Sequence, residues 1–327
     1  MQYRNKDLLK NYHFSIFLKV AVLLVVVYYI FLKLYNEEQL LFKIINEILL
    51  IFNSTSLFYL LIPILLVPLN WSVEAKKWQV LAAKISPINF RQAMSGVLSG
   101  LSLGFISPQG LGDYAGRIWH INNSRRSELV GSVLLGSIAQ AFISVFMGLL
   151  GIAYFFNLNK LYFYFEVFSF VLITASGVGI GFIFKKNYKQ SQNYLIKKLF
   201  YWSRKYLGII STYTSAELGK IIFLSLIRYI IFFFQFVWVL LLFGIDLPLD
   251  VLCAGVSWIY VAKTIIPAFN FLSDIGVREF SALLFFNPYK VEVTKIILAS
   301  LFIWIINILI PTMAGSILML RMRIFSK

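Results

Sequence analysis

Long apolar runs alternate with short polar segments along this chain, a pattern typical of a protein that crosses a membrane several times. A helix needs about 20 apolar residues to cross the hydrocarbon core. The runs of about that length cover Phe14–Leu34, Ile44–Leu69, Leu129–Phe156, Leu161–Phe184, Ile221–Phe243 and Ile296–Leu320. We expect the second run to end at Leu69, after kinks at Pro63 and Pro68, and a polar segment to follow from Asn70 to Arg91.

Two further apolar segments, Ala93–Ile106 and Leu249–Pro267, are each followed by a polar break. The first break, Ser107–Arg117, holds three glycines, a proline, an acid and a base. The second break, Phe269–Glu279, holds a glycine, two acids and an arginine. Irregular backbone at membrane depth is tolerated only where protein or water satisfies its polar groups, and charged residues there are usually functional. Each break therefore predicts a helical hairpin that re-enters the membrane.

The segments together predict an all-α polytopic membrane protein of one integral domain, with six full transmembrane helices and two re-entrant helical hairpins. One hairpin, at about residues 92–125, lies in a first half, 1–157. The other, at about 249–290, lies in a second half, 158–327, which begins on the opposite side of the membrane. This is the inverted-repeat plan of many transporters, whose site lies where the broken helices meet. The lysine-rich segment 185–220 is predicted to be cytoplasmic and amphipathic.

The composition supports a membrane protein and explains the charge. Hydrophobic residues make up 60% of the 327 residues and charged residues only 13%, against about a quarter in soluble domains. A formal net charge of +16 on a soluble protein would indicate nucleic acid. Here the bases fall mostly in loops between apolar runs, where the positive-inside rule explains them. We therefore expect no nucleic-acid partner, and cytoplasmic N- and C-termini.

The first break contains the first candidate site residues. Gly110 and Gly112 let the backbone turn sharply and approach a ligand. Asp113 and Arg117 are four positions apart, so on a helix they share a face and can form an ion pair. A helix that begins at the break would offer free N–H groups to a phosphate. The alternative is a loop at the cytoplasmic surface with both charges solvated.

The second break supplies a matching set of candidates. Asp274 and Arg278 repeat the four-residue spacing from acid to base, with Gly276 between them and Glu279 next to Arg278. Lys263 lies just before the break, within an apolar segment. A charged residue inside such a segment is costly, which favours a functional role. The alternative is an outer loop with a local ion pair.

Arg228 is a further candidate, about two turns into the run Ile221–Phe243. Its side chain either extends to the interface at little cost or binds a lipid headgroup. Metal and cofactor chemistry has no comparable signal. His13 and His120 are isolated, and the chain has no metal-ligand spacing and no phosphate-binding GxxxxGK[ST] motif. We therefore expect no metal, no cofactor and no catalytic residue.

The two breaks resemble the signatures of the lysyl-phosphatidylglycerol synthase transmembrane region, also called the flippase-like domain family. Members usually show Pro, Gly-Gly-x-Gly-Glu and Arg at the first break, where this chain has Gln109-Gly110, Asp113 and Arg117. At the second they usually show Gly-Gly-x-Gly-x-Arg-Glu, where Ser273-Asp274 replaces the first two glycines. The resemblance covers nearly the whole chain and implies the plasma (inner) membrane. It also implies the translocating domain only, without the aminoacyl-transferase domain of bifunctional members.

The sequence therefore predicts a membrane lipid translocase rather than an enzyme. It would move a phospholipid or a lipid-linked precursor between leaflets through a polar cavity at the two hairpins. The expected partners are membrane lipids with anionic phosphate headgroups, and the sequence leaves open whether the protein is a monomer or a homodimer. The alternative is a membrane enzyme, or a subunit of one, that acts on polyprenyl-phosphate-linked sugars. A structural scaffold fits the charges inside apolar segments less well.

Overall fold

The computed structural model describes residues 57–107, 110–119, 121–155, 208–265 and 271–321, and every regular element in these ranges is a helix. The main helices are α3 (Leu57–Ala82), α4 (Phe90–Ile106), α5 (Leu111–Trp119), α6 (Leu129–Phe155), α9 (Ser215–Leu242), α10 (Leu249–Ile265), α11 (Phe271–Phe286), α12 (Val293–Trp304) and α13 (Ile310–Arg321). Short turns are η2 (Arg126–Glu128), η4 (Gly208–Thr212), η5 (Asn287–Tyr289) and the π turn η6 (Ile305–Leu309). The predicted all-α class is confirmed for this part of the chain.

Three helices of the described part are long and apolar enough to cross a membrane: Arg126–Phe155, Ser215–Leu242 and Val293–Leu320. They coincide with the third, fifth and sixth runs expected from the sequence. The predicted spans Phe14–Leu34 and Leu161–Phe184 lie outside the described residues, as does most of the predicted amphipathic segment. The chain is thus a membrane protein with transmembrane helices.

Helix α3 continues past the end expected for it. Pro63 and Pro68 both lie inside the helix, so the prediction that it ends just after Pro68 is wrong. Pro63 has no N–H and leaves the carbonyl of Tyr59 without its intrahelical donor. Trp238 of α9 donates its Nε1–H to that carbonyl, at 2.9 Å. Packing against α9 thus stabilises α3 at Pro63. The polar residues after Pro68 are therefore part of the helix.

Helices α4 and α5 form a closely packed pair that doubles back on itself. Asn89 and Gln92 form a capping box that starts α4. Gly110, in the turn before α5, has a φ of +68°, which favours glycine. A Cβ on Gly116 of α5 would collide with the backbone of Gly100 of α4. The two helices therefore approach backbone to backbone, which Gly100 and Gly116 permit because they have no side chain.

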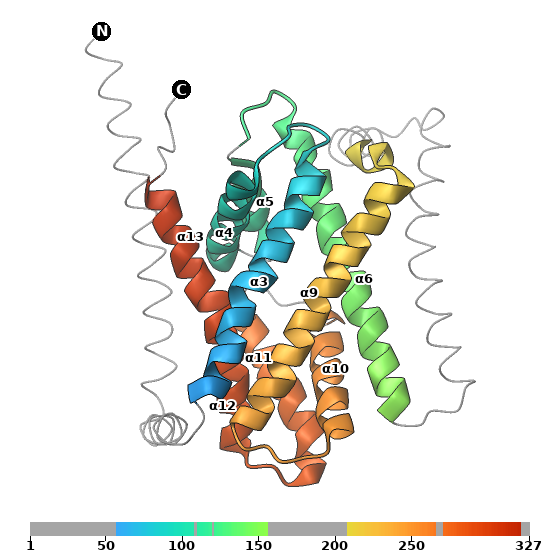
Figure 1. Cartoon of the computed structure of the whole chain (residues 1–327), viewed down its shortest axis with the longest axis vertical. Coiled ribbons are helices and arrows are strands. Elements are labelled where there is room, and N and C mark those ends of the chain that lie inside the picture. Colours follow the sequence, from blue (N-terminus) through green and yellow to red (C-terminus); the bar gives the residue numbers. More distant parts are fainter. Residues whose placement is uncertain (1–56, 108–109, 120, 156–207, 266–270, 322–327) are drawn as a thin grey trace, which may run out of the picture.

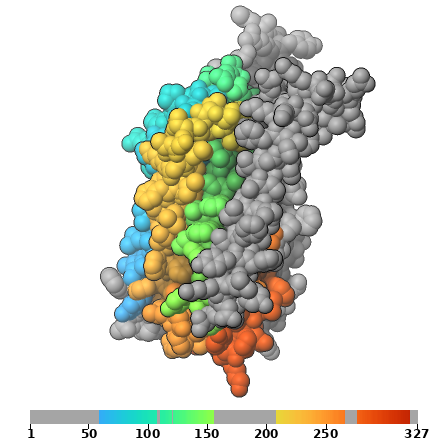
Figure 2. All heavy atoms as spheres, turned by 90° about the vertical axis from the view of Figure 1, so that its right-hand side faces the viewer, coloured from blue at the N-terminus to red at the C-terminus, as the bar shows by residue number. Residues whose placement is uncertain are grey.

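Helices α10 and α11 form the second pair. In Figure 1 the pair α4–α5 lies in the upper half of the molecule and α10–α11 in the lower half, between the long helices. The first residues of α4 and α10 lie toward opposite ends of the molecule, and the last residues of both helices lie toward its middle. The two pairs also touch, through α4 and α11. The long helices α3, α6 and α9 surround them, and α9 lies between α3 and α6 on the face shown in Figure 2.

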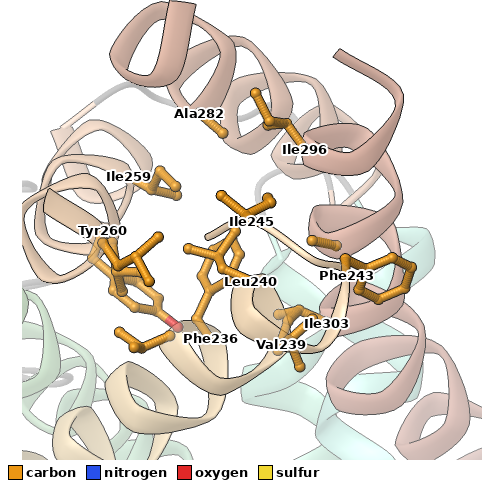
Figure 3. Packing of buried hydrophobic residues seen from close by; sticks show 14 of the residues in the cluster. Phe236, Val239, Leu240, Phe243, Ile245, Ile259, Tyr260, Ala282, Ile296 and Ile303 are labelled. Atoms are coloured by element: carbon orange, nitrogen blue, oxygen red, sulfur yellow. The ribbon is translucent and has the colours of Figure 1, made fainter. Parts of the chain in front are cut away.

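The lower half is held by an apolar core that joins four helices (Figure 3). Phe236 and Leu240 of α9 pack with Ile259 of α10, Ala282 of α11 and Ile303 of α12, and all five are 1% exposed or less. Burial of this apolar surface positions the second pair against α9 and α12. The upper half has its own core between α3, α4 and α6.

A buried polar chain ties α3 and α9 to the π turn. Asn307 of η6 donates to Gln235 Oε1 at 2.9 Å, and Gln235 Nε2 donates to the carbonyl of Pro63 at 2.7 Å. Pro311 follows the π turn, and because it has no N–H the carbonyl of Asn307 receives no α-helical hydrogen bond from it. The widened turn then places the Asn307 amide against α9.

Candidate functional site

A single buried carboxylate, that of Glu74 on α3, gathers three cations from three helices. Arg117 Nη1 of α5 lies 2.7 Å from Glu74 Oε1. Lys77 Nζ of α3 lies 2.8 Å from Oε2, and Arg228 Nη1 of α9 lies 3.0 Å from the same oxygen. With Asp113 of α5, these residues make up what we call the Glu74 cluster. It joins the first hairpin-like pair to two long helices.

Asp113 and Arg117 form the pair that their spacing predicts. Arg117 Nε donates to Asp113 Oδ1 at 2.8 Å, one turn apart on α5. The alternative of a solvated surface pair is wrong, since the Arg117 side chain is only 12% exposed and also bonds Glu74. Asp113 thus fixes the direction of the Arg117 guanidinium, and Glu74 accepts a hydrogen bond from its Nη1.

Arg228 points into the molecule, so the alternative in which it extends to the interface is wrong. Its Nε donates to Asn70 Oδ1 at 3.1 Å. Its guanidinium carbon lies 5.1 Å from the ring centroids of both Trp71 and Phe232. Cation–π contacts of this kind are favourable in a desolvated setting. The arginine is therefore held by an amide and two rings in addition to Glu74.

Lys77 lies deepest, with a side chain that is 2% exposed. Besides Glu74 it contacts Gln140 Oε1 of α6 at 3.2 Å and Ser225 Oγ of α9 at 3.5 Å. Gln140 also donates to the carbonyl of Ser225, at 3.3 Å. Three helices, α3, α6 and α9, therefore contribute polar groups around this buried ammonium. Such a network is costly to bury unless its members are paired, as they are here.

The cluster carries more positive than negative charge. Three cationic side chains face two carboxylates, which leaves a formal surplus of one positive charge. Exposure falls from 21% for the Asp113 side chain, through 14% and 12% for Arg228 and Arg117, to 4% for Glu74. Asp113 and the two arginines thus form the accessible side of the cluster, where two cations face one carboxylate. A surplus positive charge on its accessible side suits an anion.

The sequence interpretation missed Glu74, Lys77 and Asn70, because it placed them in a cytoplasmic polar segment. A signal for them exists. Positions 70, 74 and 77 recur at the spacing of one helix face, whereas Lys76 falls outside it. Asn70, Glu74 and Lys77 are 3% exposed or less. A helical reading of the segment would have placed all three on one side.

Gly110 and Gly112 lie at the start of α5, and their structural roles are plain. Gly110 provides the left-handed turn. Gly112 donates its N–H to Ser107 Oγ at 2.6 Å, and a Cβ there would collide with the carbonyl of Leu103. Gly112 therefore serves the close packing of α4 and α5. The predicted approach of a ligand to this backbone stays a prediction.

The remaining predicted site residues belong to the second pair, α10–α11. Arg278 of α11 is 4% exposed, Glu279 and Lys263 are half-buried, and Gly276 is exposed. The side chain of Asp274 lies outside the described part, although its backbone belongs to α11. These residues belong to α10 and α11, the pair in the lower half of Figure 1. Asp113, Arg117 and Arg228 are the predicted residues that the structure brings together.

Comparison with known families gives one clear result. The family model described as "Lysylphosphatidylglycerol synthase TM region" matches residues 16–315. No curated protein and no solved structure matches the chain. The family match spans both helix pairs and the Glu74 cluster, in agreement with the resemblance seen in the two breaks.

Proposed function

Because the chain belongs to the lysylphosphatidylglycerol synthase TM region family, we propose that it is a membrane lipid translocase. It moves a phospholipid or a lipid-linked precursor between the leaflets. The family supports a lipid-related membrane role, and the movement between leaflets is our step beyond it. The observation that carries the proposal is the Glu74 cluster, a buried group of charges with a positive surplus and arginines on its accessible side.

The proposed architecture has six full spans and two re-entrant hairpins, α4–α5 and α10–α11, in two inverted halves. It is supported by the positions of the two pairs, which fold back from opposite ends of the molecule (Figure 1). In transporters of this plan the substrate site lies near the midplane, between the broken helices. The termini are cytoplasmic in this proposal, and the membrane is the plasma membrane.

Headgroups enter a polar cavity between the hairpins while acyl chains stay in the bilayer. Arg117 and Arg228 engage the phosphate on the side of the first pair. Lys263 and Arg278 engage it on the side of the second pair, and Glu279 orients these bases. We call each of these two sets of basic residues a phosphate station. Two stations suit a headgroup that passes from one leaflet to the other. The first station takes Arg117 from α5 and the second takes its bases from α10 and α11, the two pairs in the upper and lower halves of Figure 1.

The test is lipid movement in reconstituted vesicles. Purified protein is placed in vesicles that contain a fluorescent phosphatidylglycerol, and an impermeant reductant bleaches the label in the outer leaflet. A translocase lets the reductant bleach more than the outer half of the label. We expect Arg278→Ala and Arg117→Gln to abolish this extra bleaching, while Arg125→Ala, in an exposed loop pair with Glu128, leaves it unchanged.

Two controls make the assay decisive. Each variant must keep the thermal unfolding midpoint of the wild type within a few degrees, so that lost movement is not lost fold. If Arg278→Ala moves lipid as fast as the wild type, the assignment of the second station is overturned. Absence of movement in the wild type, with all phosphatidylglycerol and phosphatidylethanolamine probes, would overturn the translocase itself.

A further inference from the structure

The Glu74 carboxylate lies among three cations of the kind that also bind phosphate. Its two oxygens receive Arg117 at 2.7 Å, Lys77 at 2.8 Å and Arg228 at 3.0 Å. Arginine forks bind carboxylate and phosphate oxygens with the same geometry. Three cations around one carboxylate are more than that carboxylate needs. The arrangement is that of an anion-binding site in which the Glu74 carboxylate is the bound anion.

Both arginines have contacts other than Glu74 that hold them in place. Arg117 is held by Asp113 through its Nε, so its Nη1 edge stays directed at the site. Arg228 is held by Asn70 and by the rings of Trp71 and Phe232. A site whose donors have their own supports is preorganised for another anion. Departure of Glu74 would therefore leave the two arginines in place.

Glu74 also has a partner on the deeper side of the cluster, Lys77. Lys77, one turn further along α3, bonds Glu74 and in addition contacts Gln140 and Ser225. The ammonium lies deeper than the arginines, with a side chain 2% exposed against 12% for Arg117. The carboxylate can thus turn inward to Lys77 while the arginines on the more accessible side accept a new anion.

We infer that the phosphate of a lipid headgroup displaces Glu74 from Arg117 and Arg228, and that Glu74 returns to expel it. This inference rests on the proposed function and adds the substrate class and a release device. The cluster's formal surplus of one positive charge matches a phosphodiester, which carries one negative charge. The lipid is therefore of the phosphodiester class. Glu74 competes with it, which weakens binding and permits release.

The experiment measures binding and movement in Glu74→Gln. Glutamine keeps the shape of the side chain but does not compete as an anion. The probe is dihexanoyl phosphatidylglycerol, titrated by calorimetry into the purified full chain in detergent. We expect binding to become about tenfold tighter, as for removal of a competing buried charge. Movement of long-chain lipid in vesicles should fall, because release is slowed.

A second variant separates displacement from simple charge. Glu74→Gln with Lys77→Met removes one negative and one positive group, so the formal surplus of the cluster stays the same. We expect this double variant also to bind the probe more tightly than the wild type, about threefold. Binding by the double variant tests the displacement even if Glu74→Gln alone does not fold. Glu128→Gln, in the exposed pair with Arg125, is the matched control and should bind as the wild type does.

Each outcome has a definite meaning. Equal or weaker binding by both folded variants would overturn the displacement model, while wild-type movement in the vesicle assay would leave the translocase standing. Tighter binding by the variants together with no movement by any form would support the displacement model and overturn the translocase. Inorganic phosphate and glycerophosphate are titrated in parallel. Binding of these as tight as that of the lipid would assign the site to free phosphate and overturn the lipid assignment.

Discussion

The carboxylate of Glu74 on α3 and the guanidinium of Arg228 on α9 lie 3.0 Å apart within the helix bundle. These residues are far apart in the sequence, and α3 and α9 pack together along much of their length. The pair therefore forms only when both helices are in place. Its contribution to stability can be compared with that of the other charges around Glu74.

Glu74→Gln should destabilise the protein more than Arg228→Met. Loss of the carboxylate leaves three buried cations with Asp113 as the remaining carboxylate of the cluster, for which we expect a cost of about 3 kcal/mol. Loss of Arg228 removes one of three like charges and leaves Glu74 paired with Lys77 and Arg117, for which we expect about 1 kcal/mol. Thermal unfolding of the purified protein in detergent measures the order of the two effects.

The control for this comparison is Glu128→Gln. Glu128 pairs with Arg125, whose side chain is 62% exposed, so the pair contributes little. We expect an unchanged midpoint for this variant. A larger loss of stability in Arg228→Met than in Glu74→Gln would show that the cluster has no positive surplus in solution.

The sequence was enough to predict the helices but not the centre of the cluster. Apolar runs predicted the spans of α6 and α9, and the four-residue spacing predicted the pair Asp113–Arg117. Glu74 follows two prolines and precedes several lysines, which is also the pattern of a loop at the membrane surface. Whether such a charge is buried depends on a partner from a distant segment, here Arg228. Local patterns do not carry that information.

The close approach of α4 and α5 predicts a sharp difference between two glycines. Gly116→Ala places a methyl group against the backbone of Gly100, which cannot move aside as a side chain could. Overpacking of this kind costs about 1–3 kcal/mol. We expect a lower unfolding midpoint and lost lipid movement, because Arg117 follows directly in the chain.

Gly219→Ala is the matched control for this substitution. Gly219 lies in the first turns of α9, and its added methyl group would meet no described atom within 4 Å. Alanine is favoured over glycine in a helix by about 1 kcal/mol, so the midpoint should stay or rise. Equal effects of the two substitutions would mean that α4 and α5 are not packed as closely as described.

The buried amide pair of Gln235 and Asn307 predicts coupling between α9 and η6. Asn307→Leu leaves Gln235 Oε1 without its donor. Gln235→Leu takes one acceptor from the Asn307 amide and leaves the carbonyl of Pro63 without the side-chain donor. Each single change should cost about 1–3 kcal/mol. The double change should cost clearly less than the sum, since neither amide is then left unpaired. Unfolding midpoints of the four proteins measure this, and additive losses would contradict the pairing.

The proposed inverted repeat predicts a definite membrane topology. Single cysteines at residues 122, 157, 189 and 287, in a Cys253→Ala background, can be labelled with an impermeant reagent from either side. If both α4–α5 and α10–α11 are hairpins that return to the side they entered, the positions are cytoplasmic, outer, cytoplasmic and outer in that order. The reason is that a returning hairpin adds no crossing, whereas a true span reverses every later position. Labelling of 122 from the outer side would make α4–α5 a crossing segment. Labelling of 287 from the cytoplasmic side, with 122 and 189 also cytoplasmic, would make α10–α11 one. Either result would remove the inverted repeat, and with it the two phosphate stations on opposed hairpins.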